Sequence, residues 1–369
     1  MKVLIVGQWI YPLITPRANR TWELAKGFAK SGHDVTVYAL LGDKDYSDEE
    51  KQYNIKIKNL GKSYFGLIDS QGHYKRNIVN AVMKRLVREE NSFPGLEFYP
   101  MIKNCFERES NVDLLITIAY PHVIHWAASK YLKLLAPKCW IADCGDPFMG
   151  NVFYRPRKTY EKYERRWCNL VDYITVPVED AVSGYYPEYR DKIRVIPQGF
   201  DNSGIIKAEY IPQTPPVFAF AGGTYKNLRD PRAFLKYLLD NRISCRFIVY
   251  SDSPEFNEYK DLLQGILDIK SRVPRKQLIY ELSTCDFLIN IGNGTTIQTP
   301  SKLIDYGVAN RPILTISSDF THDEQIKFMQ FLNNDYSSSE TIDVTKFEID
   351  NVVSQFCNLY HSIKADVLK

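Results

Sequence analysis

Runs of apolar residues that alternate with helix-like segments constrain this chain more than any other feature. In residues 2–7, KVLIVG, the residues after the lysine are apolar without a break and end in glycine, and residues 34–40, DVTVYAL, nearly repeat the pattern. Between them, residues 17–31 carry apolar side chains at helical spacing, and Gly32 follows as a stop signal. A continuous apolar strand must be covered on both faces, which favours parallel strands joined by crossover helices. The start of the chain therefore predicts a βαβ unit.

The same alternation runs through the whole chain in two series. The first series continues with apolar stretches at residues 113–119, 139–143, 173–177 and 193–199. A proline-containing stretch without periodicity follows at residues 201–215 and is typical of a linker. The second series has apolar stretches at residues 217–223, 245–251, 286–292 and 312–316, and residues 343–368 show a helical pattern. Two such series predict an α/β protein with two doubly wound parallel-sheet domains that face each other across a cleft.

Composition agrees with a globular protein. The chain has 369 residues, enough for two domains of ordinary size, and 25% of them are charged. No apolar run approaches the ~20 residues that cross a bilayer. No cleavage site follows the apolar start, so we expect a buried first strand and not a signal peptide. The seven cysteines are scattered without a C-x-x-C pair, which favours reduced thiols and a cytoplasmic location.

Basic residues are in excess in one part of the first half. Residues 51–110 contain eleven Lys and Arg against six Asp and Glu, while the whole chain has a net charge of +3. Within this part, residues 75–88 place apolar side chains on roughly one helical face among basic ones. Such a helix can rest on an anionic membrane surface, here the inner face of the cell membrane, or it can pack on its own domain. The modest excess accompanies no recognised motif, so we predict no nucleic-acid binding.

Four charged residues of the first series stand where a parallel sheet would present them at its carboxyl edge. Arg17 and Arg20 fall near the start of the first helix, where positive charge is disfavoured, so we expect either an anionic ligand such as a phosphate or plain solvation. Asp143 and Asp146 close and follow a buried strand. They are candidate catalytic groups that orient hydroxyls or act as a base, and loop capping is the alternative.

His122 also follows a predicted strand, in the sequence YPHVIHW. It is a candidate ligand contact, and packing on a helix face is the alternative. The H-x-x-H spacing that it forms with His125 does not by itself predict a metal site, because no acid or cysteine stands at a matching spacing nearby.

Paired glycines begin the second series of candidate residues. Gly222 and Gly223 directly follow a strand, and Lys226 and Arg229 come soon after. Glycine lets a ligand approach the backbone closely, and the two cations suit phosphate oxygens. This stretch therefore predicts a phosphate site, with an ordinary strand-to-helix loop as the alternative.

The sequence TPSKLIDYG, residues 299–307, predicts a helix start that faces the same ligand. Thr299 can cap the helix, and Ser301 and Lys302 fall in its first turn. Asp305 lies one turn further, where a carboxylate would repel a phosphate but could accept hydrogen bonds from a ribose diol. A phosphate at the helix tip and a sugar one turn along together describe a nucleotide.

These stretches, in this order, resemble glycosyltransferase family 4. The resemblance covers nearly the whole chain and is carried by KVLIVGQWIYP, WIADCGDPF, YITVPVED, IRVIPQGFD, FAFAGGTYKNLRDP, LIYELSTCDFLINI and TPSKLIDYGVANRPIL. It implies a bacterial enzyme with the GT-B fold, in which two Rossmann-like domains face each other across a cleft. The domains expected on this basis are residues 1–200, a linker at 201–215, residues 216–345, and a C-terminal helix at 346–369 that packs back on the first domain.

The resemblance also implies an activity. We expect transfer of a hexose from a UDP- or GDP-linked sugar, with retention and without a metal, to a glycan or lipid-linked glycan in cell-surface polysaccharide synthesis. Donor contacts would come from Gly222, Gly223, Lys226, Arg229, Gln298, Thr299, Ser301, Lys302 and Asp305, whereas Asp143, Asp146, Arg17, Arg20 and His122 would serve the acceptor side or the reacting sugar.

One family motif departs from its usual form. Family members usually carry two glutamates separated by seven residues; here Asp305 takes the second position and Ile297, next to Gln298, takes the first. Two alternatives follow from this departure and from the shared fold. One is a nucleotide-sugar epimerase, and the other is a non-catalytic partner of another glycosyltransferase.

Overall fold

The computed structural model contains two compact units, each built around its own parallel sheet. Unit 1 comprises residues Met1–Asp201 and Lys346–Lys369, and unit 2 comprises Asn202–Thr345. The structure describes residues 1–13, 15–62, 67–68, 74–75, 95–151, 156–224, 229–292 and 301–367, without the side chains of 67–68, 74–75, 301 and 364–367. The chain thus leaves unit 1 once and returns to it once.

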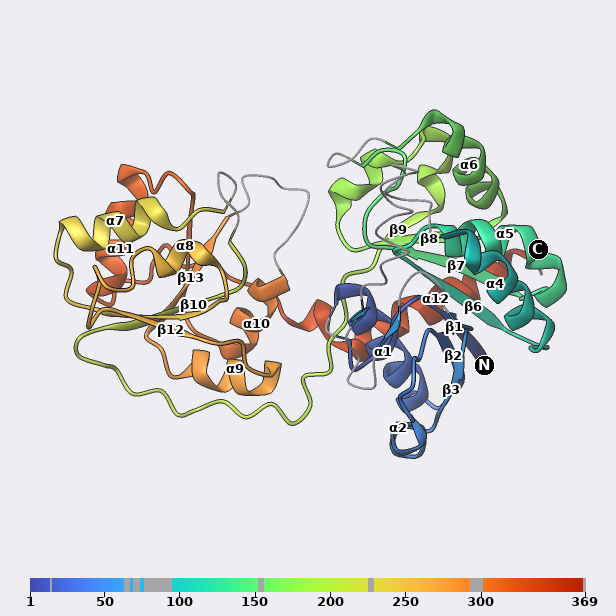
Figure 1. Cartoon of the computed structure of the whole chain (residues 1–369), viewed down its shortest axis with the longest axis horizontal. Coiled ribbons are helices and arrows are strands. Elements are labelled where there is room, and N and C mark those ends of the chain that lie inside the picture. The colour runs from blue at the N-terminus through green and yellow to red at the C-terminus, as the bar shows by residue number, and fades with distance from the viewer. Residues whose placement is uncertain are drawn as a thin grey trace. The chain divides into compact units, whose positions relative to one another are not determined.

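Unit 1 is built on a sheet of seven parallel strands in the order β3-β2-β1-β6-β7-β8-β9 (Figure 1). Its strands are β1 (Lys2–Val6), β2 (Asp34–Ala39), β3 (Ile55–Asn59), β6 (Leu114–Ala119), β7 (Cys139–Cys144), β8 (Tyr173–Val176) and β9 (Ile193–Val195). Its helices are α1 (Pro16–Lys30), α2 (Ser47–Tyr53), α4 (Phe98–Glu107), α5 (Val123–Leu135), α6 (Glu161–Leu170) and α12 (Ile349–Val367). A separate antiparallel pair joins β4 (Leu67–Ile68) to β5 (Tyr74–Lys75).

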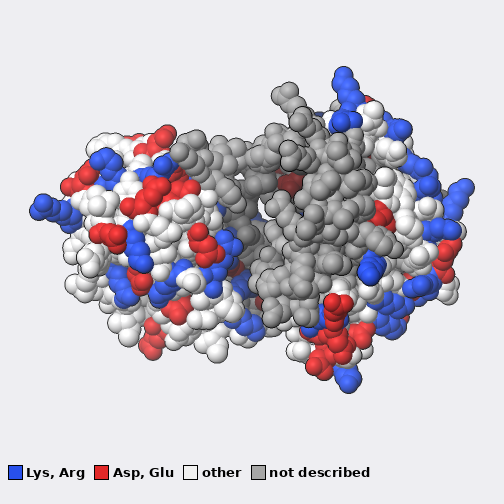
Figure 2. Space-filling view, viewed as in Figure 1, with Lys and Arg blue, Asp and Glu red and all other residues white. Residues whose placement is uncertain are grey.

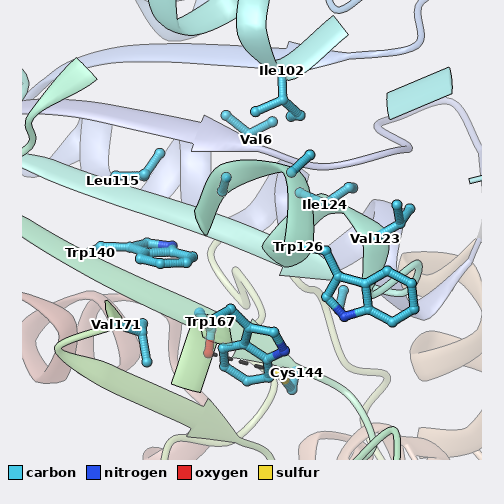
Figure 3. Close-up of a cluster of buried hydrophobic side chains, with 14 of the residues drawn as sticks. Val6, Ile102, Leu115, Val123, Ile124, Trp126, Trp140, Cys144, Trp167 and Val171 are labelled. Atoms are coloured by element: carbon cyan, nitrogen blue, oxygen red, sulfur yellow. Dashed lines mark hydrogen bonds between the residues drawn. The ribbon is translucent and has the colours of Figure 1, made fainter. Parts of the chain in front are cut away.

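Helices cover both faces of this sheet, as the continuous apolar strands predicted. Along β1, Leu4 and Val6 face one hydrophobic core with α4, α5 and α6, whereas Val3 and Ile5 face the other with α1 and α12. Figure 3 shows part of the first core, in which aromatic rings from α5, β7 and α6 gather around the sheet. Burial on both faces explains why the strands lack the alternation of a half-exposed sheet.

The C-terminal helix α12 packs against α1 within unit 1 (Figure 1). Its side chains Ile349, Val353 and Phe356 enter the second core, and the approach is so close that a Cβ on Gly27 would lie 2.6 Å from Ile349 Cγ1. A glycine in α1 therefore lets the two helices meet.

Asp113 fastens three segments of unit 1 together, and its replacement should alter acid stability. Its carboxylate accepts hydrogen bonds from the Lys2 backbone N–H at 2.8 Å, Lys138 Nζ at 2.6 Å and the Tyr360 hydroxyl at 3.3 Å. The hydrogen bond from Lys138 and that from the Lys2 backbone lower the pKa of Asp113 to about 2. A lowered pKa means that the folded state favours the ionised carboxylate, so this stabilisation is present above the ordinary pKa and is lost as the pH falls through about 2.

We therefore expect Asp113→Asn to destabilise unit 1 at pH 7 by roughly 1 kcal/mol, a value reduced for solvent screening of the partly exposed side chain. The difference from the wild type should vanish in acid. Urea unfolding at several pH values measures it, and because all five tryptophans lie in unit 1, their fluorescence follows that unit. A difference that stays constant from pH 7 to pH 2 would contradict the assignment.

Unit 2 is built on five parallel strands in the order β12-β11-β10-β13-β14. They are β10 (Val217–Ala221), β11 (Arg246–Tyr250), β12 (Leu267–Lys270), β13 (Phe287–Ile291) and β14 (Ile313–Ile316). The helices are α7 (Arg232–Asp240), α8 (Pro254–Asn257), α9 (Arg275–Ser283), α10 (Ser301–Ala309) and α11 (His322–Leu332). A phenylalanine-rich core packs α7, α8 and α11 on one face, and a second core packs α9 and α10 on the other.

The stretch that we predicted as a linker runs along unit 2 without helix or strand. Asp286, 2% exposed, accepts hydrogen bonds from the Tyr210 hydroxyl at 2.6 Å and from the backbone N–H groups of Gln213 at 3.2 Å and Val217 at 2.7 Å. The Ala208 N–H donates to Ser283 Oγ at 2.8 Å. These bonds hold the stretch on the edge where β10 begins.

Charged residues of both signs lie on the surface of the protein (Figure 2). On the face shown in Figure 2, basic and acidic residues are interspersed on both units. None of the helices in the described part of the chain has the length and apolar character that a membrane span requires. Apart from the backbone of Lys75 in β5, the basic stretch at residues 75–88 lies outside the described residues.

Candidate functional site

Asp143 lies at the carboxyl end of β7 and binds two arginines of α1. It is 2% exposed, and Arg20 Nη2 donates to its Oδ1 at 2.8 Å while Arg20 Nε lies 3.2 Å from both oxygens. Arg17 Nη1 lies 3.3 Å from Oδ2, and Thr175 Oγ1 on β8 donates to Oδ1 at 2.8 Å. One carboxylate thus joins the first two turns of a helix to the end of the sheet.

Opposing effects set the charge states of this cluster. Burial by itself raises the pKa of Asp143, but the guanidinium groups of Arg20 and Arg17 outweigh it, so the pKa is below its ordinary value. Burial lowers the pKa of Arg17, and the attraction to Asp143 opposes that effect. Arg20 also donates to the backbone oxygen of Pro197 at 2.6 Å. The structure therefore places Arg20 as a buried partner of Asp143, and the anion that these arginines face belongs to the chain itself.

The loop after β7 places the second predicted acid near this cluster. Asp146 is exposed, so its carboxylate can meet solvent or a ligand. Arg17 crosses the loop so closely that a Cβ on Gly145 would lie 3.0 Å from its Cζ, and the Arg17 side chain keeps 17% of its surface exposed. Of the four charged residues predicted here, Arg17 and Asp146 are therefore the two whose side chains are not buried.

Two backbone contacts fix the far end of the same loop. The Met149 N–H donates to Glu164 Oε2 on α6 at 2.9 Å. Gly150 packs against Gly184 in the 3₁₀ helix η3 (Glu179–Gly184), where a Cβ would lie 2.1 Å from the Gly184 oxygen. The loop is therefore held at both ends.

His122 lies inside unit 1. It is 3% exposed, and its ring packs 5.2 Å from the ring of Phe148. Burial lowers the pKa of His122 to about 4, so its imidazole is neutral at physiological pH. The structure thus shows a packed histidine, and a contact between His122 and an acceptor stays a prediction.

In unit 2, the end of β10 meets cations from two other elements. Gly222 has φ +143°, a backbone conformation that favours glycine, and a Cβ there would lie 3.8 Å from both Arg229 Nη1 and Lys302 Cγ. Arg229 is 7% exposed, and its Nε donates to the Ile291 oxygen at 2.6 Å. The structure therefore brings together the backbone of Gly222 and the side chains of Arg229 and Lys302, which the sequence analysis had assigned to one site.

Asp305 on α10 pairs with two cations. Its Oδ1 accepts from Arg275 Nε at 2.6 Å and its Oδ2 from Lys302 Nζ at 2.9 Å, while the carboxyl side chain is 5% exposed. Arg275 Nη2 also donates to Asn202 Oδ1 at 2.9 Å. In this structure Asp305 therefore orients Arg275 and Lys302, and a contact with a ribose stays a prediction.

Several predicted contacts fall where the structure gives no description. Lys226, Gln298 and Thr299, together with Ile297, lie outside the described residues, and the side chain of Ser301 is not described although its backbone begins α10. Gly223 is described directly after Gly222 but has no side chain to place.

Sequence reasoning missed two residues of the unit 2 site. Arg275 is the first residue of α9, and an arginine at a helix start is the same anomaly that singled out Arg17, so this signal was present. Asn290 on β13 accepts from Arg229 Nη2 at 3.3 Å, and a single polar residue in an apolar strand gives a weaker signal.

Known proteins agree with this architecture. Residues 18–203, half of the chain, match the family model described as Glycosyltransferase Family 4. No curated protein matches the chain in sequence. The family match ends where unit 2 begins, so the similarity of unit 2 to known proteins rests on the solved structures.

Solved structures resemble the chain along nearly its full length. Anabaena HepE, in complex with UDP and glucose, is 10% identical with a TM-score of 0.61 over 98% of this chain and 100% of that one. TarM is 10% identical with a TM-score of 0.62 over 97% of this chain and 98% of that one. The lipopolysaccharide outer core galactosyltransferase WaaB is 10% identical with a TM-score of 0.59 over 98% and 99%.

At this identity the structures show the fold, and the family match shows the family. The predicted fold class, two parallel-sheet α/β domains of GT-B type, is confirmed. The chain therefore belongs to glycosyltransferase family 4 and is a glycosyltransferase with the GT-B fold.

Proposed function

We propose that this glycosyltransferase transfers a hexose from a UDP-linked sugar to a hydroxyl of a glycan or lipid-linked glycan in cell-surface polysaccharide synthesis, with retention and without a catalytic metal. The single observation that carries the donor part is the convergence of Gly222, Arg229 and Lys302 at the end of β10. We choose UDP over GDP because HepE is described in complex with UDP and glucose, and TarM of S. aureus with UDP.

The chemistry of the donor site follows from its charges. As the glycosidic bond breaks, negative charge develops on the leaving diphosphate, and preorganised cations that face it stabilise the transition state. Hydrogen bonds to Ile291 and Asn290 hold the Arg229 guanidinium, and Asp305 holds Lys302 Nζ. Gly222 adds a backbone without a side chain, so a phosphate can come close.

The acceptor part rests on unit 1. Asp146 and Arg17 stand at the carboxyl end of its sheet, where open α/β sheets bind ligands. Asp143 is buried and bonded to Arg17, so in this proposal it acts by positioning Arg17. WaaB, described as a lipopolysaccharide outer core galactosyltransferase, supports a glycan acceptor. Membrane contact through residues 75–88 stays a sequence-based prediction, which sedimentation with anionic vesicles can check.

Lys302→Met should weaken UDP binding about tenfold or more, because a charge-assisted hydrogen bond contributes about 1.5–3 kcal/mol and 1.4 kcal/mol is tenfold. Lys302 suits this test better than Arg229, because its side chain is 34% exposed and its removal leaves the core intact. Calorimetry with UDP gives the affinity. Lys236→Met on α7, an exposed lysine also paired with an aspartate, is the matched control and should bind as the wild type does.

Equal affinities for the wild type and both variants would refute the phosphate site. A panel of UDP- and GDP-linked sugars, read by thermal shift and by nucleotide release with and without glycan acceptors, then identifies the substrates. Stabilisation by GDP and not UDP would overturn the choice of base. An isomerised sugar formed from donor alone would indicate the epimerase instead.

A further inference from the structure

A buried group of metal-ligand type lies in unit 1, apart from the charged residues assigned to transfer. His122 precedes α5, His125 lies in its first turn, and Cys144 ends β7. One ligand atom from each lies within 4.8 Å of the other two, and all three residues are buried. The H-x-x-H spacing lacked a third ligand in sequence, and folding supplies one from a neighbouring strand.

Hydrogen bonds orient the His125 ring toward the cysteine. Its Nδ1 lies 2.8 Å from Thr117 Oγ1, which also accepts from Trp140 Nε1 at 2.8 Å. The other nitrogen, Nε2, lies 3.3 Å from Cys144 Sγ. In metal sites a ligating histidine commonly donates its second N–H to a protein oxygen in this way, which fixes the tautomer and the ring.

The two nitrogens of the His122 ring also differ in their contacts. The ring forms a hydrogen bond with the backbone of Asp146, whereas its Nδ1 is buried and has no hydrogen-bond partner among the described residues. Both ring nitrogens of His125 have a neighbouring side chain as partner, but the Nδ1 of His122 has none among the described residues. Buried polar atoms in native proteins normally have a partner, so this nitrogen calls for a ligand.

We propose that His122, His125 and Cys144 bind a zinc ion. Imidazole nitrogen and thiolate sulfur are the ligands that zinc prefers, and the neutral imidazoles that burial enforces are the ligating form. Around a tetrahedral zinc, such ligand atoms lie roughly 3.3–3.6 Å apart, so the His125–Cys144 distance already fits and the His122 ring closes the rest.

Binding exchanges a proton for the metal: the Cys144 thiol releases H⁺ to solvent as the Zn–S bond forms, and both imidazoles stay neutral. Three protein ligands leave the fourth position to a water molecule, an arrangement more usual in catalytic zinc sites. Here the three ligands are at most 3% exposed inside the core of unit 1, so a substrate does not reach the ion. Because β6 leads into His122 and β7 ends at Cys144, the ion would tie these strand ends together behind the loop that carries Asp146. We assign the ion a structural role.

Metal analysis of the full-length protein tests the proposal. The protein, prepared without a histidine tag and equilibrated with zinc before desalting, should retain one zinc ion per chain by mass spectrometry of the elements. Cys144→Ser should abolish retention, whereas Cys105→Ser, which changes another buried cysteine of the same core, should retain it. Retention in both variants, or in neither, would overturn the site.

A second measurement avoids dependence on variant folding. Cobalt added to the chelator-treated wild type should give thiolate-to-cobalt absorption in the near ultraviolet and tetrahedral bands in the visible, and zinc should abolish both. Absence of this spectrum, or absence of zinc from the equilibrated protein, would each overturn the assignment.

Discussion

Asp143→Asn is expected to lower the free energy of unfolding of unit 1 by about 3–5 kcal/mol, the usual effect of removing one partner from a buried ion pair. The Arg20 side chain is only 3% exposed, so without the carboxylate its charge is left buried. The asparagine keeps the shape and one acceptor oxygen, so the loss reports the charge. Urea unfolding followed by tryptophan fluorescence measures it, because the five tryptophans all lie in unit 1.

The same substitution at an exposed pair provides the control. Asp350 on α12 pairs with Lys30 at 2.8 Å, and the two side chains are 59% and 56% exposed. Exposed pairs of this kind contribute about 0–1 kcal/mol. If Asp143→Asn destabilises unit 1 no more than Asp350→Asn does, the ion pairs of Asp143 do not stabilise unit 1 as their contacts indicate.

Gly150→Ala should destabilise unit 1 by about 3 kcal/mol or more, at or beyond the upper end of the ordinary range for overpacking. The added Cβ would lie 2.1 Å from the oxygen and 2.7 Å from the carbonyl carbon of Gly184, and these are backbone atoms that no side-chain rotation can move. The loop that carries Asp146 must therefore shift, so we also expect transfer activity to fall more than UDP binding does.

Gly7→Ala is the matched control for this clash. There the nearest atom is the Thr21 hydroxyl at 2.9 Å, which can rotate away from Arg17 at the loss of one hydrogen bond, about 1 kcal/mol. Fluorescence-detected unfolding compares the two variants, and initial transfer rates are read on the same samples. Equal destabilisation by both alanines would show that the loop yields more easily than its backbone contacts indicate.

The continuous apolar strands made the fold predictable from the sequence. Strands with polar residues among the apolar ones were not predicted. β3 and β12 lie at the edges of their sheets, so they need not be apolar on both faces. β3 alternates buried and exposed residues, and β12 has one buried residue. α4 was not predicted either, because the basic residues 75–88 gave the stronger helical pattern in this part of the chain. Edge position and local charge weakened the signal in each case.

The candidate residues were predictable by type, but their partners were not. An arginine at a helix start signals that an anion is near, yet nothing local to Arg20 indicates that the anion is Asp143, 123 residues away. The same limit applies to His125 and Cys144, which meet only because β6 and β7 are neighbours. Strand order, which is a property of the whole chain, decides these pairs.

The place of α12 has a consequence for how the protein is made. Unit 1 takes residues from both ends of the chain, and Val352, Phe356 and Tyr360 of α12 complete its second core. Domains usually fold in the order in which the ribosome delivers them, the N-terminal one first. Here the whole of unit 2 leaves the ribosome before the last piece of unit 1, so the unit that is started first is finished last. Until α12 is made, the face of α1 that α12 covers stays uncovered in the nascent chain, and a chaperone would bind this apolar surface.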